Sequence, residues 1–147
     1  MTNIQEKIIE RVRAIIIDSN KILLINRVKK EDSYWVIPGG GVEQNESHEH
    51  AIKRECLEEL GIEIQVLRLF LRRIGDKPGM EGQCEFFYLC DMVGGKVGTG
   101  QGPEFQLGTQ YKGEYRISWV NLEKLTDLNL KPKEIKEKII QEYKINK

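Results

Sequence analysis

The chain has 147 residues, the length of one ordinary domain, and 39% of them are hydrophobic while 31% are charged. This composition is too apolar for a disordered chain and too charged for a membrane protein, whose helices need ~20 apolar residues to span a bilayer. Lys and Arg together number 23, as do Asp and Glu. The basic excess typical of proteins that bind nucleic-acid polymers is therefore missing, whereas a small anionic ligand is compatible with a locally basic site.

The three cysteines, Cys56, Cys84 and Cys90, form no CxxC pair. We interpret them as buried free thiols in a reducing compartment, the alternative being a metal or redox role. The first six residues lack the apolar core of a signal peptide. The sequence therefore predicts a cytoplasmic protein that does not contact membranes.

Five segments have the β-branched, aliphatic or alternating pattern of strands. The first two, residues 11–18 and 21–27, are joined by the turn-forming residues 18–20 and are predicted to form a hairpin. The other three are residues 64–74, 84–93 and 115–120. Strands outnumber helices and separate them along the chain, which favours a mixed sheet flanked by helices.

Two segments have helical signals. Residues 47–60 begin at Ser47, a good N-cap, and end before Gly61, which tolerates a left-handed conformation. Residues 132–145 begin with Pro132 in a first-turn position and carry apolar side chains on one face. A shorter helical turn is expected at 122–125.

Two further segments are predicted to be loops. Residues 28–41 run through a charged stretch into a Pro-Gly-Gly-Gly turn, and residues 94–114 contain seven glycines with almost no apolar periodicity. A structureless segment of ~20 residues in a compact domain indicates either function or disorder. We expect 94–114 to be a mobile loop that becomes ordered on the substrate.

Carboxylates crowd one face of the first predicted helix. At about 100° per residue, Glu55, Glu58 and Glu59 fall within an arc of about 100°. Like charges one turn apart destabilise an isolated helix, so such a cluster needs a compensating cation. Arg54 supplies part of the charge, and a divalent cation such as Mg²⁺ would supply more. The apolar residues of the same turns fall on the opposite arc and are expected to face the core: Cys56, Leu57 and Leu60.

An acidic face exposed to solvent is the alternative interpretation of this helix, but the glycine turn directly before it argues for a site. With that turn, residues 40–62 resemble the Nudix box, the metal-binding loop and helix of Nudix hydrolases. Seven positions match the family pattern at fixed spacing: Gly40, Glu46, Arg54, Glu55, Glu58, Glu59 and Gly61. The resemblance covers roughly residues 10–145 and implies one domain over 1–147 with an α/β fold, a Nudix-type α/β/α sandwich around a central mixed β-sheet.

The resemblance implies hydrolysis of a nucleoside diphosphate linked to another moiety, with Mg²⁺ or Mn²⁺ as cofactor. Glu58 and Glu59 would bind the cation, with Glu55 as a further ligand or as the general base and the Gly40 carbonyl completing the shell. The cation would neutralise the diphosphate and lower the pKa of a bound water. Hard oxygen ligands favour Mg²⁺ or Mn²⁺ over zinc.

The resemblance also implies roles for residues around these carboxylates. Arg54 would orient a box glutamate, and Glu46 would support the loop that meets the substrate. Arg27 occupies the place of a substrate-phosphate contact, although an ordinary arginine at a strand end is the alternative. Glu104 would be an additional metal ligand or the catalytic base delivered by the glycine-rich loop, with Glu114 as the competing candidate.

The expected partner is a small nucleotide, not a nucleic-acid polymer, and a homodimer is left open. The substrate is not identified among nucleoside triphosphates, ADP-ribose, dinucleoside polyphosphates and the 5′ ends of RNA. One alternative is a regulatory module that binds a nucleotide on this fold without hydrolysing it, but the three glutamates argue against that. An isopentenyl diphosphate isomerase would need additional catalytic residues and a longer chain.

Overall fold

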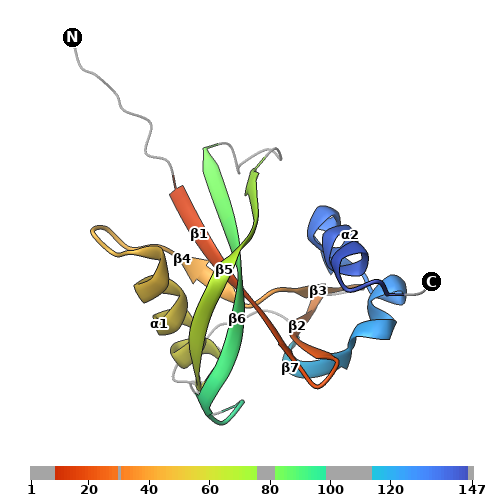
Figure 1. Cartoon of the computed structure of the whole chain (residues 1–147). Helices are drawn as coiled ribbons and strands as arrows, with labels where there is room; N and C mark the ends of the chain where they lie inside the picture. Colours follow the sequence, from red (N-terminus) through yellow and green to blue (C-terminus); the bar gives the residue numbers. More distant parts are fainter. Residues whose placement is uncertain (1–8, 30, 76–81, 99–113, 146–147) are drawn as a thin grey trace.

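The computed structural model describes residues 9–29, 31–75, 82–98 and 114–145. Its centre is a curled, mixed sheet of eight strands, with helix α1 on one side and helix α2 on the other (Figure 1). This arrangement confirms the predicted α/β class with helices on both faces of a mixed sheet. None of the helices within the described residues is long and apolar enough to cross a membrane.

The strands follow the order β5-β6-β1-β2-β3-β8, with β4 paired to β1 and β7 paired to β2. The pairs β1–β6 and β3–β8 are parallel, and the remaining pairs are antiparallel. The strand bounds are β1 Ile9–Asp18, β2 Lys21–Lys29, β3 Asp32–Val36, β4 Gly39–Gly41, β5 Ile62–Ile74, β6 Gln83–Gly95, β7 Glu114–Asn121 and β8 Leu130–Lys131. The helices are α1 His48–Leu60, the 3₁₀ helix η2 Leu122–Asp127 and α2 Lys133–Glu142.

The predicted hairpin is confirmed, since β1 pairs with β2 through Ile17 opposite Ile22 and Asp18 opposite Lys21. Its two turn residues, Ser19 and Asn20, both have positive φ, at 52° and 64°. Two successive positive φ values give the backbone twist that a two-residue hairpin turn needs.

The prediction that residues 28–41 form a loop is wrong. Residues 32–36 form β3, antiparallel to β2, and the three glycines 39–41 form β4, antiparallel to β1. A Cβ atom on Gly39 would collide with the carbonyl oxygen of Val12, so only glycine allows this close approach of the two strands. Three glycines offer no side-chain pattern, which is why the sequence gives no strand signal here.

The prediction that residues 94–114 form a loop is wrong at both ends of the segment, which belong to strands. Gly94 and Gly95 belong to the end of β6, with Gly95 opposite Ile62 of β5, and β7 begins at Glu114. Residues 99–113, and with them Glu104, lie outside the described residues. The mobile-loop hypothesis therefore stays a prediction.

Each face of the sheet has its own hydrophobic core. One core lies between the sheet and α1 and includes Ala14, Ile52 and Cys56, all less than 2% exposed. The other lies under α2 and includes Phe87 and Ile139, both fully buried. Full burial of such a side chain stabilises the fold by ~1.5–3 kcal/mol. The three cysteines are buried and free, as predicted.

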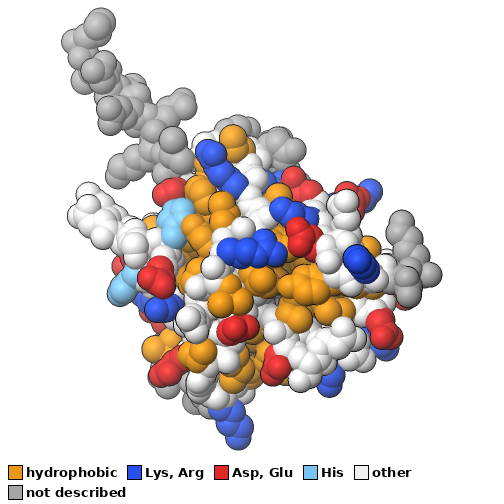
Figure 2. Space-filling view, viewed as in Figure 1, with side chains coloured by type: hydrophobic (Ala, Val, Ile, Leu, Met, Phe, Trp, Pro, Cys, Tyr) orange, Lys and Arg blue, Asp and Glu red, His pale blue; other side chains and the backbone are white. Residues whose placement is uncertain are grey.

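The edge strand β5 carries three exposed apolar side chains, Leu67, Leu69 and Ile74. On the face shown in Figure 2, hydrophobic side chains gather over the middle of the molecule, with Lys and Arg side chains among them. Arg68 and Arg72 are exposed on the same strand. Charges along an edge strand discourage its pairing with another chain.

Candidate active site

Both ends of α1 are fixed by the residues that the sequence predicts. The Ser47 side chain accepts a hydrogen bond from the backbone N–H of His50, at 3.1 Å. Gly61 has φ 79°, and its N–H donates to the Leu57 carbonyl at 3.0 Å. These caps fix the helical register of the box carboxylates.

The prediction for the buried face of α1 is wrong at one position. Cys56 and Leu60 are buried as expected, but Leu57 is 54% exposed. The buried arc is shifted because Ala51 and Ile52 are buried as well, and these residues lie on either side of Glu55 around the helix axis. Glu55 therefore faces the protein, whereas Leu57 lies beyond the buried arc.

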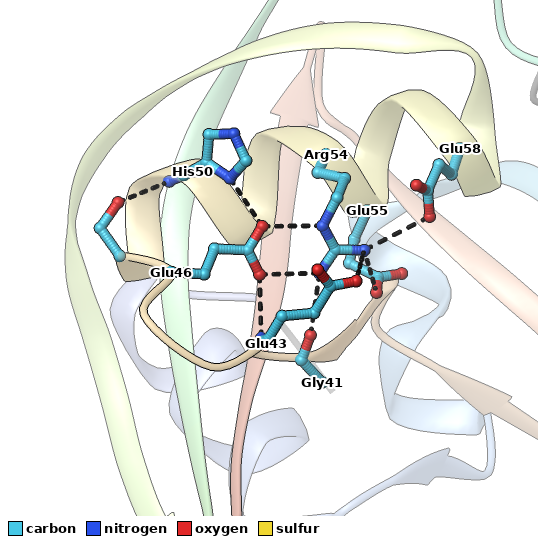
Figure 3. A network of polar contacts seen from close by, with 8 residues as sticks. Gly41, Glu43, Glu46, His50, Arg54, Glu55 and Glu58 are labelled. Atoms are coloured by element: carbon cyan, nitrogen blue, oxygen red, sulfur yellow. Dashed lines mark hydrogen bonds and ion pairs between the residues drawn. The ribbon is translucent and has the colours of Figure 1, made fainter.

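Arg54 and Glu46 form a two-point ion pair beside this helix (Figure 3). The Nε and Nη2 atoms of Arg54 donate to Oε2 and Oε1 of Glu46 at 2.8 and 2.9 Å. The backbone N–H of Glu43 donates to Oε1, and His50 Nδ1 lies 2.6 Å from Oε2. The hydrogen bond from Arg54 is the largest cause that lowers the pKa of Glu46 to about 2, and it raises the pKa of Arg54 in return.

The remaining donors of Arg54 connect the preceding turn to two box carboxylates. Nη2 donates to the Gly41 carbonyl at 3.1 Å. Nη1 lies 3.1 Å from Oε1 of Glu55 and 3.4 Å from Oε2 of Glu58 (Figure 3). Two carboxylates thus converge on one cationic nitrogen, as the charge pattern of the helix requires.

Glu55 lies against the glycine turn. Its side chain is 17% exposed, and a Cβ atom on Gly40 would overlap its carboxylate. Burial raises the pKa of Glu55, while the charge of Arg54 opposes this rise. A half-buried carboxylate with a raised pKa beside other carboxylates is typical of functional sites.

Glu59 takes a different direction from Glu58. Its Oε1 accepts a hydrogen bond from the backbone N–H of Gly39 at 3.4 Å, and its side chain lines a cavity. Within the described part of the chain, no group of three His, Cys, Asp or Glu side chains is arranged to hold a metal ion. The donor set nevertheless fits a hard divalent cation, since all its donors are oxygens and two already meet at one positive charge.

The cavity beside Glu59 has a volume of about 470 Å³. Arg27, the predicted phosphate contact, lies in its wall, together with the aromatic side chains of Tyr34 and Phe87. Four other basic residues of the lining were not predicted from the sequence: Arg11, Arg13, Arg73 and Lys131. The available signal was the alternation on β1, where Arg11 and Arg13 flank the fully buried Val12.

The structure leaves both candidates for an additional base untested. Glu104 lies outside the described residues. Glu114 begins β7, where its backbone pairs with Val28 of β2.

The NUDIX domain family model matches residues 8–143 of the chain. The chain therefore belongs to the Nudix family, which confirms the family that the sequence resembles. Its fold also matches solved structures. The solution structure of the Escherichia coli ORF135 protein covers 90% of this chain and 89% of its own, with a TM-score of 0.65 and 26% identity. The match to a MutT Nudix hydrolase from Burkholderia pseudomallei covers 80% of this chain and 86% of that one, with a TM-score of 0.62 and 27% identity.

Two curated relatives carry named activities. A CTP pyrophosphohydrolase from Escherichia coli (strain K12) is 48% identical over 62 residues, which cover 41% of this chain and 46% of that protein. An 8-oxo-dGTP diphosphatase from Buchnera aphidicola subsp. Acyrthosiphon pisum is 42% identical over 52 residues, covering 35% and 42%. The matched part spans less than half of the length of each relative. The similarity supports the hydrolase class of the family.

Proposed function

We propose that the protein is a divalent-cation-dependent pyrophosphohydrolase that cleaves a nucleoside diphosphate linked to another moiety. One observation carries the proposal: Glu59 of the Nudix box lines a cavity whose wall has five cationic side chains and only two acidic ones, Glu59 itself and Glu85. Such a cavity suits an anionic ligand. Its volume of about 470 Å³ is in the range of small-molecule sites, roughly 300–1,000 Å³.

We propose that some box residues bind the cation and that others hold these ligands in place. Glu55, Glu58, Glu59 and the Gly40 carbonyl would hold Mg²⁺ or Mn²⁺, which when bound neutralises the diphosphate and lowers the pKa of water. Arg54 holds Glu55 and Glu58 in place through Nη1. Glu46 in turn anchors Arg54.

For the substrate we propose a nucleoside triphosphate, with an ADP-ribose-like nucleotide as the alternative. The similarity to enzymes named for CTP and 8-oxo-dGTP supports the first choice. One water molecule would then be added across a bridging P–O bond, giving a nucleoside monophosphate and pyrophosphate. Tyr34 and Phe87 supply aromatic surface in the cavity wall. The three buried free thiols support a cytoplasmic location.

The general base is proposed to be Glu55 or Glu104. Glu104→Gln should lower kcat strongly at saturating Mg²⁺ and substrate if Glu104 is the base, because a positioned base contributes about 10²–10⁴-fold. Glu114→Gln is the matched comparison and should change kcat little. Equal, small effects of both substitutions would leave Glu55 as the base.

The function is tested with purified protein, Mg²⁺ and a panel of CTP, 8-oxo-dGTP and ADP-ribose, with products separated by anion-exchange chromatography. We expect turnover of at least one triphosphate to the monophosphate and pyrophosphate. Glu49→Gln is the control on the same helix, because Glu49 is exposed and forms a surface ion pair with Lys53. Nucleotide binding without any product would contradict the proposal and support the regulatory module.

A further inference from the structure

A carboxylate in the cavity wall has no role in the function proposed so far. Among the described residues, Glu85 on β6 is the one charged residue that is buried, with 5% of its surface exposed. Burying a carboxylate costs several kcal/mol unless it is paired and hydrogen-bonded. A side chain that serves packing alone would be apolar here, next to the fully buried Phe87.

Two guanidinium groups from different strands satisfy Glu85. Its Oε2 accepts from Nε of Arg13 on β1 at 3.2 Å, and its Oε1 accepts from Nη1 of Arg73 on β5 at 2.6 Å. Arg73 is held from its other side by Glu134 of α2, whose Oε1 lies 2.5 Å from the Arg73 Nε. Arg13, Glu85 and Arg73 therefore form a row across β1, β6 and β5, and all three line the cavity.

Arg13 connects this row to the Nudix box. Its Nη1 donates to the Ile37 carbonyl at 3.4 Å, and its side chain lies directly over Gly39, where a Cβ atom would come within 2.9 Å of the Arg13 Cδ. The N–H of Gly39 is the group that donates to Glu59. Arg13 is therefore next to the box at the cavity wall. Its hydrogen bonds to Glu85 and Ile37 within the described residues use two of its five N–H donors.

We propose that Arg13 binds the phosphate chain of the substrate, and that Glu85 is a positioning residue that holds the Arg13 guanidinium over Gly39. The inference rests on the proposed function and extends it to residues outside the Nudix box. The position favours phosphate over the base, because the scissile diphosphate must lie beside Glu59 to be hydrolysed. A guanidinium held by a carboxylate also presents its remaining donors in a fixed plane, which suits phosphate oxygens.

The binding test uses methylenediphosphonate, whose bridging carbon prevents hydrolysis, and isothermal titration calorimetry with Mg²⁺. Arg13→Gln should weaken binding about 10–100-fold, the value of a hydrogen bond to a charged group, and Arg13→Lys should restore part of the affinity. The Arg13→Gln variant should fold, because Glu85 still accepts a hydrogen bond from Arg73. Arg72→Gln is the matched control, since Arg72 lies over Phe86 on the opposite face of the sheet. Unchanged affinity in Arg13→Gln would overturn the phosphate contact.

The Glu85→Gln variant distinguishes two possible roles of Glu85: holding the Arg13 guanidinium in place, and contributing negative charge to the cavity. The substitution makes the cavity more positive, so a role through charge alone would strengthen diphosphonate binding. Positioning predicts the opposite, a weaker complex with a raised KM for the nucleotide and a smaller change in kcat. Stronger binding would overturn the role of Glu85, and if this variant does not fold, the Arg13 pair of variants decides. Wild-type protein that binds the probe but hydrolyses no nucleotide would contradict the proposed function alone.

Discussion

The ionised carboxylate of Glu46 stabilises the fold, and this contribution to stability depends on pH. The bidentate contact with Arg54 lowers its pKa from the ordinary 4.5 to about 2. Because the unfolded chain binds this proton more readily, the contact stabilises the fold fully above about pH 4.5 and loses its effect as the pH falls toward 2.

Glu46→Gln should therefore lower the unfolding temperature at pH 7, and the difference from wild type should shrink as the pH falls from about 4.5 toward 2, because the unfolded chain takes up the proton before the folded carboxylate does. Thermal unfolding followed by circular dichroism measures both. Glu49→Gln should change the unfolding temperature little at any pH, because an exposed pair is worth about 0–1 kcal/mol. A Glu46→Gln difference that stays constant across this pH range would contradict the argument.

Glu59→Gln tests the carboxylate that faces the cavity. We expect turnover to fall by about 10²-fold or more, because the substitution removes a proposed cation ligand. The helix should stay folded, since the substitution also relieves repulsion between like charges. Steady-state kinetics and circular dichroism check the two halves of this prediction. A rate near that of wild type would show that Glu59 is not a ligand.

At the level of elements, β4 sets the distance between the sheet and the box helix. A Cβ atom on Gly40 would overlap the Glu55 carboxylate, whereas one on Gly41 would meet nothing within 4 Å. Gly40→Ala should thus displace Glu55 and lower kcat by about 10²-fold, the typical cost of a misplacement near 1 Å. Gly41→Ala is the matched control and should keep wild-type kinetics. Equal kinetics of the two variants would show that the spacing does not matter.

The elements that the sequence predicted correctly have local signals. Ser47 and Gly61 mark the ends of α1, and both caps are present. The missed elements lack such signals: β4 is made of three glycines, and β3 follows a charged stretch. Leu57 was misplaced because the arc that a helix buries depends on what packs against it, which periodicity alone does not show.

At the level of the whole molecule, the parallel pairing of β1 with β6 brings together residues that are far apart in the sequence. Arg13 of β1 and Glu85 of β6 are 72 positions apart. The contact between β5 and α2 likewise joins Arg73 and Glu134, which are 61 positions apart. The carboxylate cluster lies within one helix and could be predicted from spacing. The basic residues of the cavity come from β1, β2, β5 and β8, so a local pattern such as the alternation on β1 indicates only two of the five.

We propose that hydrolysis by this protein depends on a divalent cation held by the box carboxylates. The most direct test measures turnover of the best nucleotide in the panel with Mg²⁺, then in excess EDTA, and again after Mg²⁺ is restored. We expect activity to disappear in EDTA and to return with Mg²⁺ or Mn²⁺, because the proposed ligands are all oxygen atoms. Full activity in excess EDTA would show that hydrolysis does not depend on a divalent cation.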